Sequence, residues 1–403
     1  MVHLSPLLCI AAAAALLSAA DATPLVPRNP THSNAPAKAV FFQTNKSPNS
    51  VVALPVVDAD GKLGDPVFHP TGGNGAAELA ATGGPSTPDS LGSQDSVVVE
   101  GNHLFAVNAG SNQLSLFCIP PSSPTNLSLV GTYTTPGDFP VSLAVHRDLV
   151  CVAHAGSRAG VSCARWTPRG IDPFDALRSL DLNQTNPPST SRNLLSETYF
   201  AHDGQGPVLV AHVRGITSTT NNTNTGFLAT WAVDQQQKTQ TRVSDKATIV
   251  SPSGTASLFG AAPIPHSSLV FVADPTFGGV TIDLARPQTP VTKTVVPRQK
   301  AICWARLGVN HSTGILPDAG LNRIVQVDLL SGGILQDWTS ANGNAGNFDF
   351  SLAGDRLYAL AFGAGDTTAH VAVFDVSGFP FADVQNVVVN GTDRFSMGLA
   401  VYS

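Results

Sequence analysis

A two-strand pattern recurs seven times along this chain of 403 residues. Each copy has an apolar segment, a polar turn rich in Asn, Asp or Gly, and a second segment in which apolar residues alternate. This order is typical of a β-hairpin. Because the copies resemble one another, the pattern predicts a fold built from repeated units. The copies cover residues 40–55, 104–117, 149–163, 208–233, 269–284, 315–329 and 357–376.

Further apolar segments precede and follow the hairpins, and the two sets are offset by one unit. Strands before a hairpin are predicted at residues 93–99, 140–146, 197–201, 257–263, 302–309, 348–353 and 395–402. Strands after a hairpin are predicted at residues 66–69, 127–134, 177–182, 242–250, 291–296, 334–338 and 384–389. The first hairpin has no strand before it, and the last strand, 395–402, has no hairpin after it.

A ring resolves this offset, because the C-terminal strand can complete the first unit and leave no unit unpaired. The 381 residues that follow a 22-residue leader give about 54 residues per unit, enough for four strands with some long loops. The sequence therefore predicts an all-β fold, a seven-bladed β-propeller with four-stranded blades. It forms one domain over residues 39–403.

The scarcity of charge agrees with such a fold. Only 12% of the residues are charged, whereas an average globular protein has about 25%. Helices use Glu and Lys to cover their exposed faces, so the composition argues against a helix-rich fold. The 42% of hydrophobic residues supply a large core. A net charge of −6 without basic clusters argues against nucleic acid as a partner.

The N-terminus has the features of a secretory signal peptide. An apolar run, Leu4–Leu17, precedes the small residues of Ala20-Asp21-Ala22, which suit cleavage after residue 22. The run is too short to span a membrane, and no later stretch is long and apolar enough to do so. We therefore predict a signal peptide over residues 1–22, a Pro-rich lead over 23–38, and a monomer that is secreted, extracellular or held at the cell wall.

Two further features fit an extracellular glycoprotein. Cys151 and Cys163 lie on two strands that flank one turn, so they are predicted to form a disulfide. Cys118 and Cys303 lie in apolar segments far apart and are expected to be buried free thiols. Six Asn-x-Ser/Thr sequons mark candidate glycosylation sites, at Asn45, Asn126, Asn183, Asn221, Asn310 and Asn390.

The segment Phe105–Phe117, FAVNAGSNQLSLF, resembles the hairpin motif of lactonase-type seven-bladed propellers. That group includes bacterial 6-phosphogluconolactonases, fungal carboxymuconate-lactonising enzymes and their secreted fungal relatives. Residues 139–145 and 318–328 add to the likeness, which extends through nearly the whole mature chain. The resemblance implies opening or closing of a lactone ring in a central funnel, by a His, a carboxylate and arginines.

The resemblance does not extend to the expected catalytic residues. The family often has His directly after the Pro that opens an inner strand, whereas Val141 follows Pro140 in this chain. A Glu is expected just after the first hairpin strand of a middle blade, but the corresponding positions hold Ala109, Ala155, Pro275 and Ala319. Because the motif describes turns and core, it indicates the fold and leaves the activity open.

The repeats nominate a candidate site of their own. The last position of each first hairpin strand is expected at one rim of the propeller, around the funnel mouth. His side chains and carboxylates there suit acid–base catalysis or a divalent metal, although Asn and Asp at such positions also satisfy turn amides. No short metal-binding spacing or cofactor motif is present, so no metal and no cofactor is predicted. The rim positions are Asn108, His154, His212, Asp274 and Asp318.

Two charged residues belong to predicted inner strands. Arg306 lies in the apolar segment 303–309, where its guanidinium would bind a carboxylate or phosphate ligand or pair with a neighbouring Asp. Glu197 opens the inner strand of the fourth unit and is either a ligand-binding acid in the channel or an exposed turn residue.

Two functions are compatible with these features. The first is an enzyme of the lactonase or muconate-cyclase type that acts on a small carboxylated lactone or related ring in the funnel. The second is a non-catalytic secreted glycoprotein that binds a cell-wall glycan or a small molecule. The missing His and Glu, together with the six sequons, are the reason to consider the second, and the sequence leaves both functions equally open.

Overall fold

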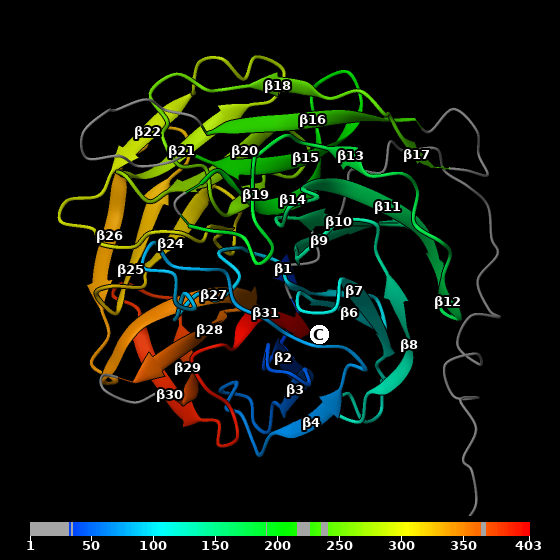
Figure 1. The fold of residues 1–403 in the computed structure, drawn as a ribbon. Coiled ribbons are helices and arrows are strands. Elements are labelled where there is room, and N and C mark those ends of the chain that lie inside the picture. The colour runs from blue at the N-terminus through cyan, green and yellow to red at the C-terminus, as the bar shows by residue number, and fades with distance from the viewer. Residues whose placement is uncertain (1–31, 34, 191, 216–225, 235–240, 364–367) are drawn as a thin grey trace, which may run out of the picture.

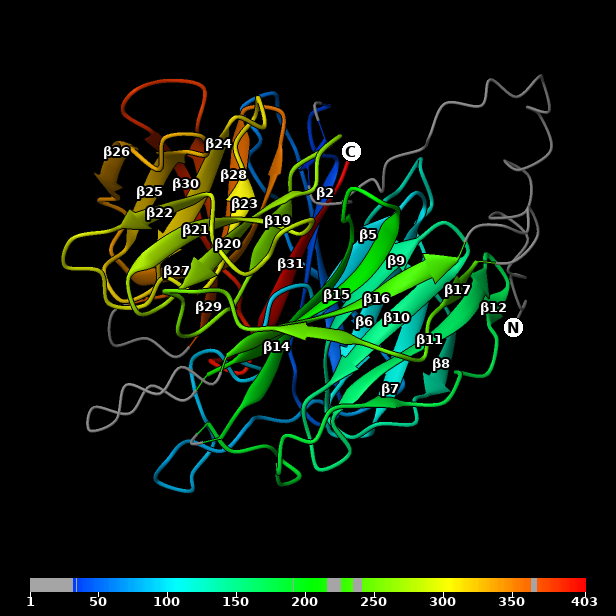
Figure 2. The same ribbon diagram turned by 90° about the horizontal axis from the view of Figure 1, so that it is seen from above.

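The computed structural model describes residues 32–33, 35–190, 192–215, 226–234, 241–363 and 368–403. Seven antiparallel sheets stand around a central axis and form a seven-bladed β-propeller, as predicted (Figure 1). Figure 2 shows the same ring from the side. No helix in the described part of the chain is long and apolar enough to cross a membrane.

Each blade has four main strands, named in order from the inner to the outer strand. The first blade consists of β31 (Met397–Tyr402), β2 (Ala39–Gln43), β3 (Ser50–Pro55) and β4 (Val67–Pro70). The second consists of β5 (Val97–Glu100), β6 (His103–Asn108), β7 (Gln113–Cys118) and β8 (Ser128–Thr134). The third consists of β9 (Pro140–His146), β10 (Leu149–His154), β11 (Gly160–Thr167) and β12 (Gly170–Ile171), and β13 (Arg178–Ser179) also pairs with β11.

The fourth blade consists of β14 (Leu194–His202), β15 (Pro207–Arg214), β16 (Phe227–Asp234) and β17 (Arg242–Val243), and β18 (Thr248–Val250) also pairs with β16. The fifth consists of β19 (Ala261–Pro263), β20 (Leu269–Asp274), β21 (Gly278–Asp283) and β22 (Thr292–Val295). The sixth blade consists of β23 (Arg306–Leu307), β24 (Thr313–Asp318), β25 (Arg323–Asp328) and β26 (Ile334–Thr339). The seventh consists of β27 (Asn344–Ala353), β28 (Arg356–Gly363), β29 (Ala369–Asp375) and β30 (Ala382–Val388).

The C-terminal strand closes the ring, as the offset of the repeats predicts. β31 pairs antiparallel with β2, with Ala39 opposite Tyr402 and Val40 opposite Val401. The first blade is therefore built from both ends of the chain, so the ring has no unpaired blade. A short strand, β1 (His32–Ser33), pairs parallel with the inner strand β27 of the last blade.

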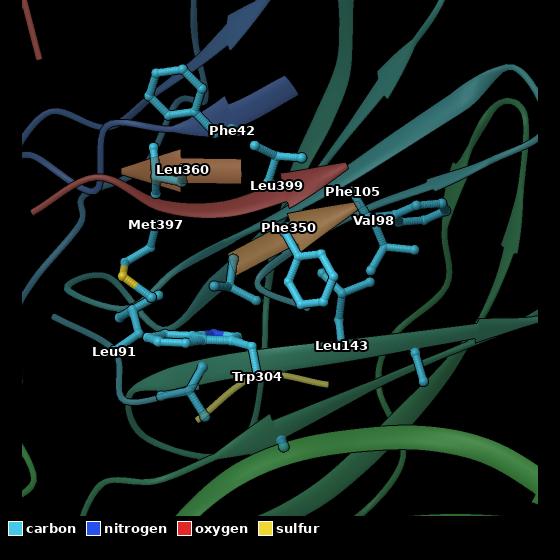
Figure 3. Packing of buried hydrophobic residues seen from close by; sticks show 14 of the residues in the cluster. Phe42, Leu91, Val98, Phe105, Leu143, Trp304, Phe350, Leu360, Met397 and Leu399 are labelled. Atoms are coloured by element: carbon cyan, nitrogen blue, oxygen red, sulfur yellow. The ribbon is translucent and has the colours of Figure 1, made fainter. Parts of the chain in front are cut away.

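Packing between blades explains the low charge of the sequence. The inner strand β9 and second strands such as β10 and β20 are buried along almost their whole length, because adjacent blades cover both of their faces. Outer strands such as β8 and β30 are partly exposed. Figure 3 shows apolar side chains from distant parts of the chain packed together, among them Trp304, Leu91 and Met397.

The cysteines follow the prediction in part. Cys151 and Cys163 face each other across β10 and β11 and form the predicted disulfide, with Cα atoms 4.0 Å apart. Cys303 is a free thiol. Cys118 is disulfide-bonded, so the expectation of a free thiol there is wrong. An apolar setting does not decide whether a second sulfur comes within reach.

Candidate functional site

The five rim positions are fully buried and belong to separate blades. Asn108, His154, Asp274 and Asp318 end the second strand of their blades, as predicted, while His212 lies two residues before the end of β15. The carboxylates bind turn amides. Asp274 accepts hydrogen bonds from the N–H groups of residues 256, 257 and 276 at 2.7–3.1 Å. Asp318 accepts them from residues 300, 301 and 320 at 3.0–3.1 Å.

These bonds tie the loop that enters an inner strand to the strand beside it. Asp318 is also paired with Arg323, whose Nη2 lies 3.0 Å from Oδ2. Asn108 has the same kind of role, because its Oδ1 accepts hydrogen bonds from Thr71 at 2.6 Å and Asn49 at 3.1 Å. The geometry of all three rim residues thus matches the structural alternative, in which they satisfy loop groups.

The two rim histidines are neutral and enclosed. Burial lowers the pKa of His154 to about 4, and Nδ1 lies 3.3 Å from the Gly160 carbonyl. Burial also lowers the pKa of His212 to about 4. Its Nδ1 donates to the Phe259 carbonyl at 2.8 Å, so its Nε2 accepts the hydroxyl of Tyr199 at 2.8 Å. The partners of each rim residue belong to its own surroundings, and the structure does not bring the five together as one site.

Arg306 and Glu197, by contrast, meet two further acids around the channel axis. Arg306 Nη2 lies 2.5 Å from Asp95 Oδ1 and 3.5 Å from Asp349 Oδ1, and its Nε donates to the Phe350 carbonyl at 3.1 Å. Glu197 lies within β14 and is fully buried, which excludes an exposed turn position. We call Asp95, Glu197, Arg306 and Asp349 the channel cluster.

The channel cluster holds three carboxyl groups against one guanidinium. Burial raises the pKa of Glu197 well above its usual value, and the Asp95 charge adds to this effect while Arg306 opposes it. Burial likewise raises the pKa of Asp349 to about 7, against the pull of Arg306. Among the described residues, Glu197 Oε2 and Asp349 Oδ2 have no hydrogen-bond partner. These groups therefore retain protons at a pH where ordinary carboxyl groups are ionised.

A second set of charges lies at the end of the channel where the inner strands begin, which we call the mouth. Arg214 ends β15, its side chain is 17% exposed, and its Nη2 lies 3.2 Å from Glu78 Oε2. Its guanidinium lies 4.9 Å from the centre of the Phe259 ring. Asp89 is partly exposed, and burial together with the Glu78 charge raises its pKa to about 8. We call Glu78, Asp89 and Arg214 the mouth group.

One long connection supplies acids to both groups. Residues 71–96 join β4 to β5 across the mouth, and we call them the mouth loop. They contribute Glu78 and Asp89 to the mouth group and Asp95 to the channel cluster. Sequence reasoning missed these acids and Arg214. A connection of this length is rare unless it has a function, so its length is the signal that could have found them.

The geometry of the described residues does not support a metal centre, and it supports only some of the predicted glycosylation sites. Within the described residues, no group of three or more His, Cys, Asp or Glu is arranged to hold a metal ion. Asn45 does not fit the glycosylation prediction, because it is buried and its Nδ2 donates to the Ala76 carbonyl at 2.7 Å and to Ser90 Oγ at 2.8 Å. Asn221 lies outside the described residues, whereas Asn126, Asn183, Asn310 and Asn390 are exposed.

Comparison with known proteins supports the fold. No family model matches the sequence, and no curated protein matches it. Among solved structures, a protein from Lactobacillus plantarum is 12% identical with a TM-score of 0.63, covering 91% of this chain and 100% of its own. A candidate 6-phosphogluconolactonase from Bacteroides fragilis is 10% identical with a TM-score of 0.61, covering 91% and 98%. A hypothetical selenium-binding protein from Sulfolobus tokodaii is 9% identical with a TM-score of 0.58, covering 93% and 97%. At these identities the likeness concerns the fold alone, which this chain shares with these three proteins.

Proposed function

We propose that this protein is a lactonase-like enzyme that binds a small carboxylated lactone or related ring at the mouth of the channel. The observation that carries the proposal is a partly exposed guanidinium, Arg214, which is paired with Glu78 and acts on a second carboxyl group, Asp89, whose pKa is raised to about 8. Perturbed acids beside a fixed cation are typical of active sites. This assignment replaces the rim histidines with the mouth group.

Each residue of the mouth group has a role in this proposal. The Arg214 side chain is 17% exposed, so its guanidinium can donate a hydrogen bond to the carboxylate of a ligand. Asp89 stays protonated near neutral pH and can donate its proton to the ring oxygen of a lactone. Water adds to the carbonyl carbon, the ring C–O bond breaks, and the proton lost by that water returns to the Asp89 carboxylate. The products balance as one hydroxy acid per lactone and water.

The test is a panel of carboxylated lactones, with both turnover and binding measured. Asp89→Asn should lower kcat by about a hundredfold or more while KM changes little, because only the proton donor is lost. Arg214→Lys should mainly raise KM, because the bidentate guanidinium is lost. Asp60→Asn, at an acid that is 65% exposed, is the matched control. Turnover absent from the whole panel would contradict the proposal.

The second candidate is a secreted, non-catalytic glycoprotein that binds a cell-wall glycan. It is favoured by the apolar filling of the channel near Trp304 and by the four exposed sequons. The signal peptide on which secretion depends, residues 1–22, lies outside the described residues and stays a prediction. Retention on wall polysaccharide, equal in wild type and Asp89→Asn and without lactone turnover, would select this candidate.

A further inference from the structure

We propose that the mouth loop is a pH-dependent closure of the channel, which stays in place while the acids of the loop and of the channel wall hold protons and loosens when they ionise. The proposal goes beyond the catalytic assignment and does not depend on it. It rests on two structural facts. The loop is fastened to four blades besides the two that it joins, and carboxyl groups are concentrated where it meets the ring.

Gln94 is the central attachment of the mouth loop. Its Nε2 donates to Glu197 Oε1 and to the Ala261 carbonyl, both at 2.8 Å, and its Oε1 accepts the N–H of Ala305 at 3.0 Å. Its own N–H donates to the Ser196 carbonyl at 3.0 Å. One side chain on the loop thus connects three blades across the channel.

The neighbouring residues of the loop make similar contacts. Ser93 Oγ donates to the Val141 carbonyl at 2.7 Å, and the Ser93 carbonyl accepts the indole N–H of Trp304 at 3.0 Å. At the other side of the mouth, Ser90 Oγ donates to the Phe395 carbonyl at 2.8 Å. Since these bonds reach the inner strands of several blades or the segments leading into them, the loop must leave them together if it moves.

Charge is unbalanced where the mouth loop meets the ring. Five carboxyl groups face two guanidiniums across the mouth and the channel. The Tyr199 hydroxyl and the Cys303 thiol lie beside them, and burial raises the pKa of each. If all five carboxyl groups ionise, the site has three excess negative charges in a poorly solvated space, which repel one another. The groups concerned are Glu78, Asp89, Asp95, Glu197 and Asp349, with Arg214 and Arg306.

The direction of the pH effect follows from proton binding. Acids with raised pKa values hold protons in the folded state that they release in an open or unfolded state. Their stabilising contribution is complete below about pH 4 and is lost as the pH rises through about 7 for Asp349 and about 8 for Asp89. Buried histidines such as His154 and His212 act on the whole fold in the opposite direction. A local measurement is therefore required.

The sequence offers such a measurement, because Glu occurs only at Glu78, Glu100 and Glu197. A Glu-specific protease applied to the full chain reports closure of the loop at Glu78, which is 2% exposed. Cleavage at Glu197, which is fully buried in β14, reports opening of the ring itself. Glu100, at the end of β5, is a reference site. Rates at each pH are divided by the rate on a synthetic peptide of residues 73–84.

We expect the normalised rate at Glu78 to rise about tenfold between about pH 5.5 and about pH 8.5, while the rate at Glu197 stays low. In the double variant Asp89→Asn, Asp349→Asn the rise should fall below about threefold, because the amides cannot ionise. Asp60→Asn should behave as wild type. A flat profile at Glu78, a parallel rise at Glu78 and Glu197, or an undiminished rise in the double variant would each overturn the proposal.

Discussion

Arg306 Nη2 lies 2.5 Å from Asp95 Oδ1, which joins the inner strand of the sixth blade to the segment that enters the second blade. Both side chains are almost fully buried. The pair thus crosses the channel, and it links the mouth loop to the ring. If the Arg306 charge is removed, the buried carboxyl groups beside it lose their opposite charge.

Arg306→Met should therefore destabilise the protein by roughly 3–5 kcal/mol, because three carboxyl groups lose their guanidinium. Urea unfolding at about pH 7 gives the free energy of unfolding. Arg286→Met is the matched control, since the Arg286 side chain is 86% exposed. Equal losses in the two variants would contradict a structural role for the buried pair.

Removal of the disulfide should cost no more than removal of the buried pair. The bond between Cys151 and Cys163 closes a short loop, with a sequence separation of 12, so the double Ser variant should lose roughly 2–4 kcal/mol. Thermal unfolding in the absence of reductant measures the change. Cys303→Ser is the control, because Cys303 is a free thiol. A larger loss of stability in Cys303→Ser than in the double Ser variant would contradict the prediction for the disulfide.

Acid should weaken the fold through its buried histidines. His212 is neutral when folded and has a pKa of about 4, so unfolded chains take up a proton that folded chains refuse between about pH 6.5 and 4. Stability is lost as the pH falls through that window. His212→Gln should reduce this loss, which urea midpoints at about pH 6.5 and pH 4.5 would detect. An unchanged pH dependence would show that His212 is not the source.

Ring closure should be indispensable. Deletion of residues 397–403 removes β31, the strand that pairs with β2, and exposes the buried faces of the first blade. We expect loss of cooperative thermal unfolding, measured by circular dichroism. Asp60→Asn is the control and should leave the transition intact, because the Asp60 side chain is 65% exposed. A truncated ring that melts as wild type does would contradict the closure.

The ring could be predicted because its signals are local and repeated. Each hairpin carries its own turn residues, as with Asn112 and Asn322, whose positive φ angles of 54° and 50° suit Asn. The unpaired strand at residues 395–402 then fixes the closure. The same repeats correctly predict the strand ends that hold Asn108 and Asp318.

The site could not be predicted in the same way. The sequence does not distinguish an Asp at a strand end that faces a ligand from one, such as Asp318, that accepts hydrogen bonds from the amides of a loop. The acids that do gather, among them Asp89 and Asp95, belong to a connection without repeat partners, and Asp349 joins them only when the ring closes. Their proximity depends on the path of the mouth loop, which no periodic pattern describes.

The most direct test of the protonation state of Asp89 is infrared difference spectroscopy of the carboxylic C=O band between about pH 6.5 and about pH 9. Both proposals require that Asp89 keeps its proton near neutral pH, since its pKa is raised to about 8. We predict a protonated-carboxyl band at the lower pH that loses intensity at the higher pH, and this loss should be smaller in Asp89→Asn. A spectrum with no such band at about pH 6.5, or a band unaffected by Asp89→Asn, would contradict the central claim.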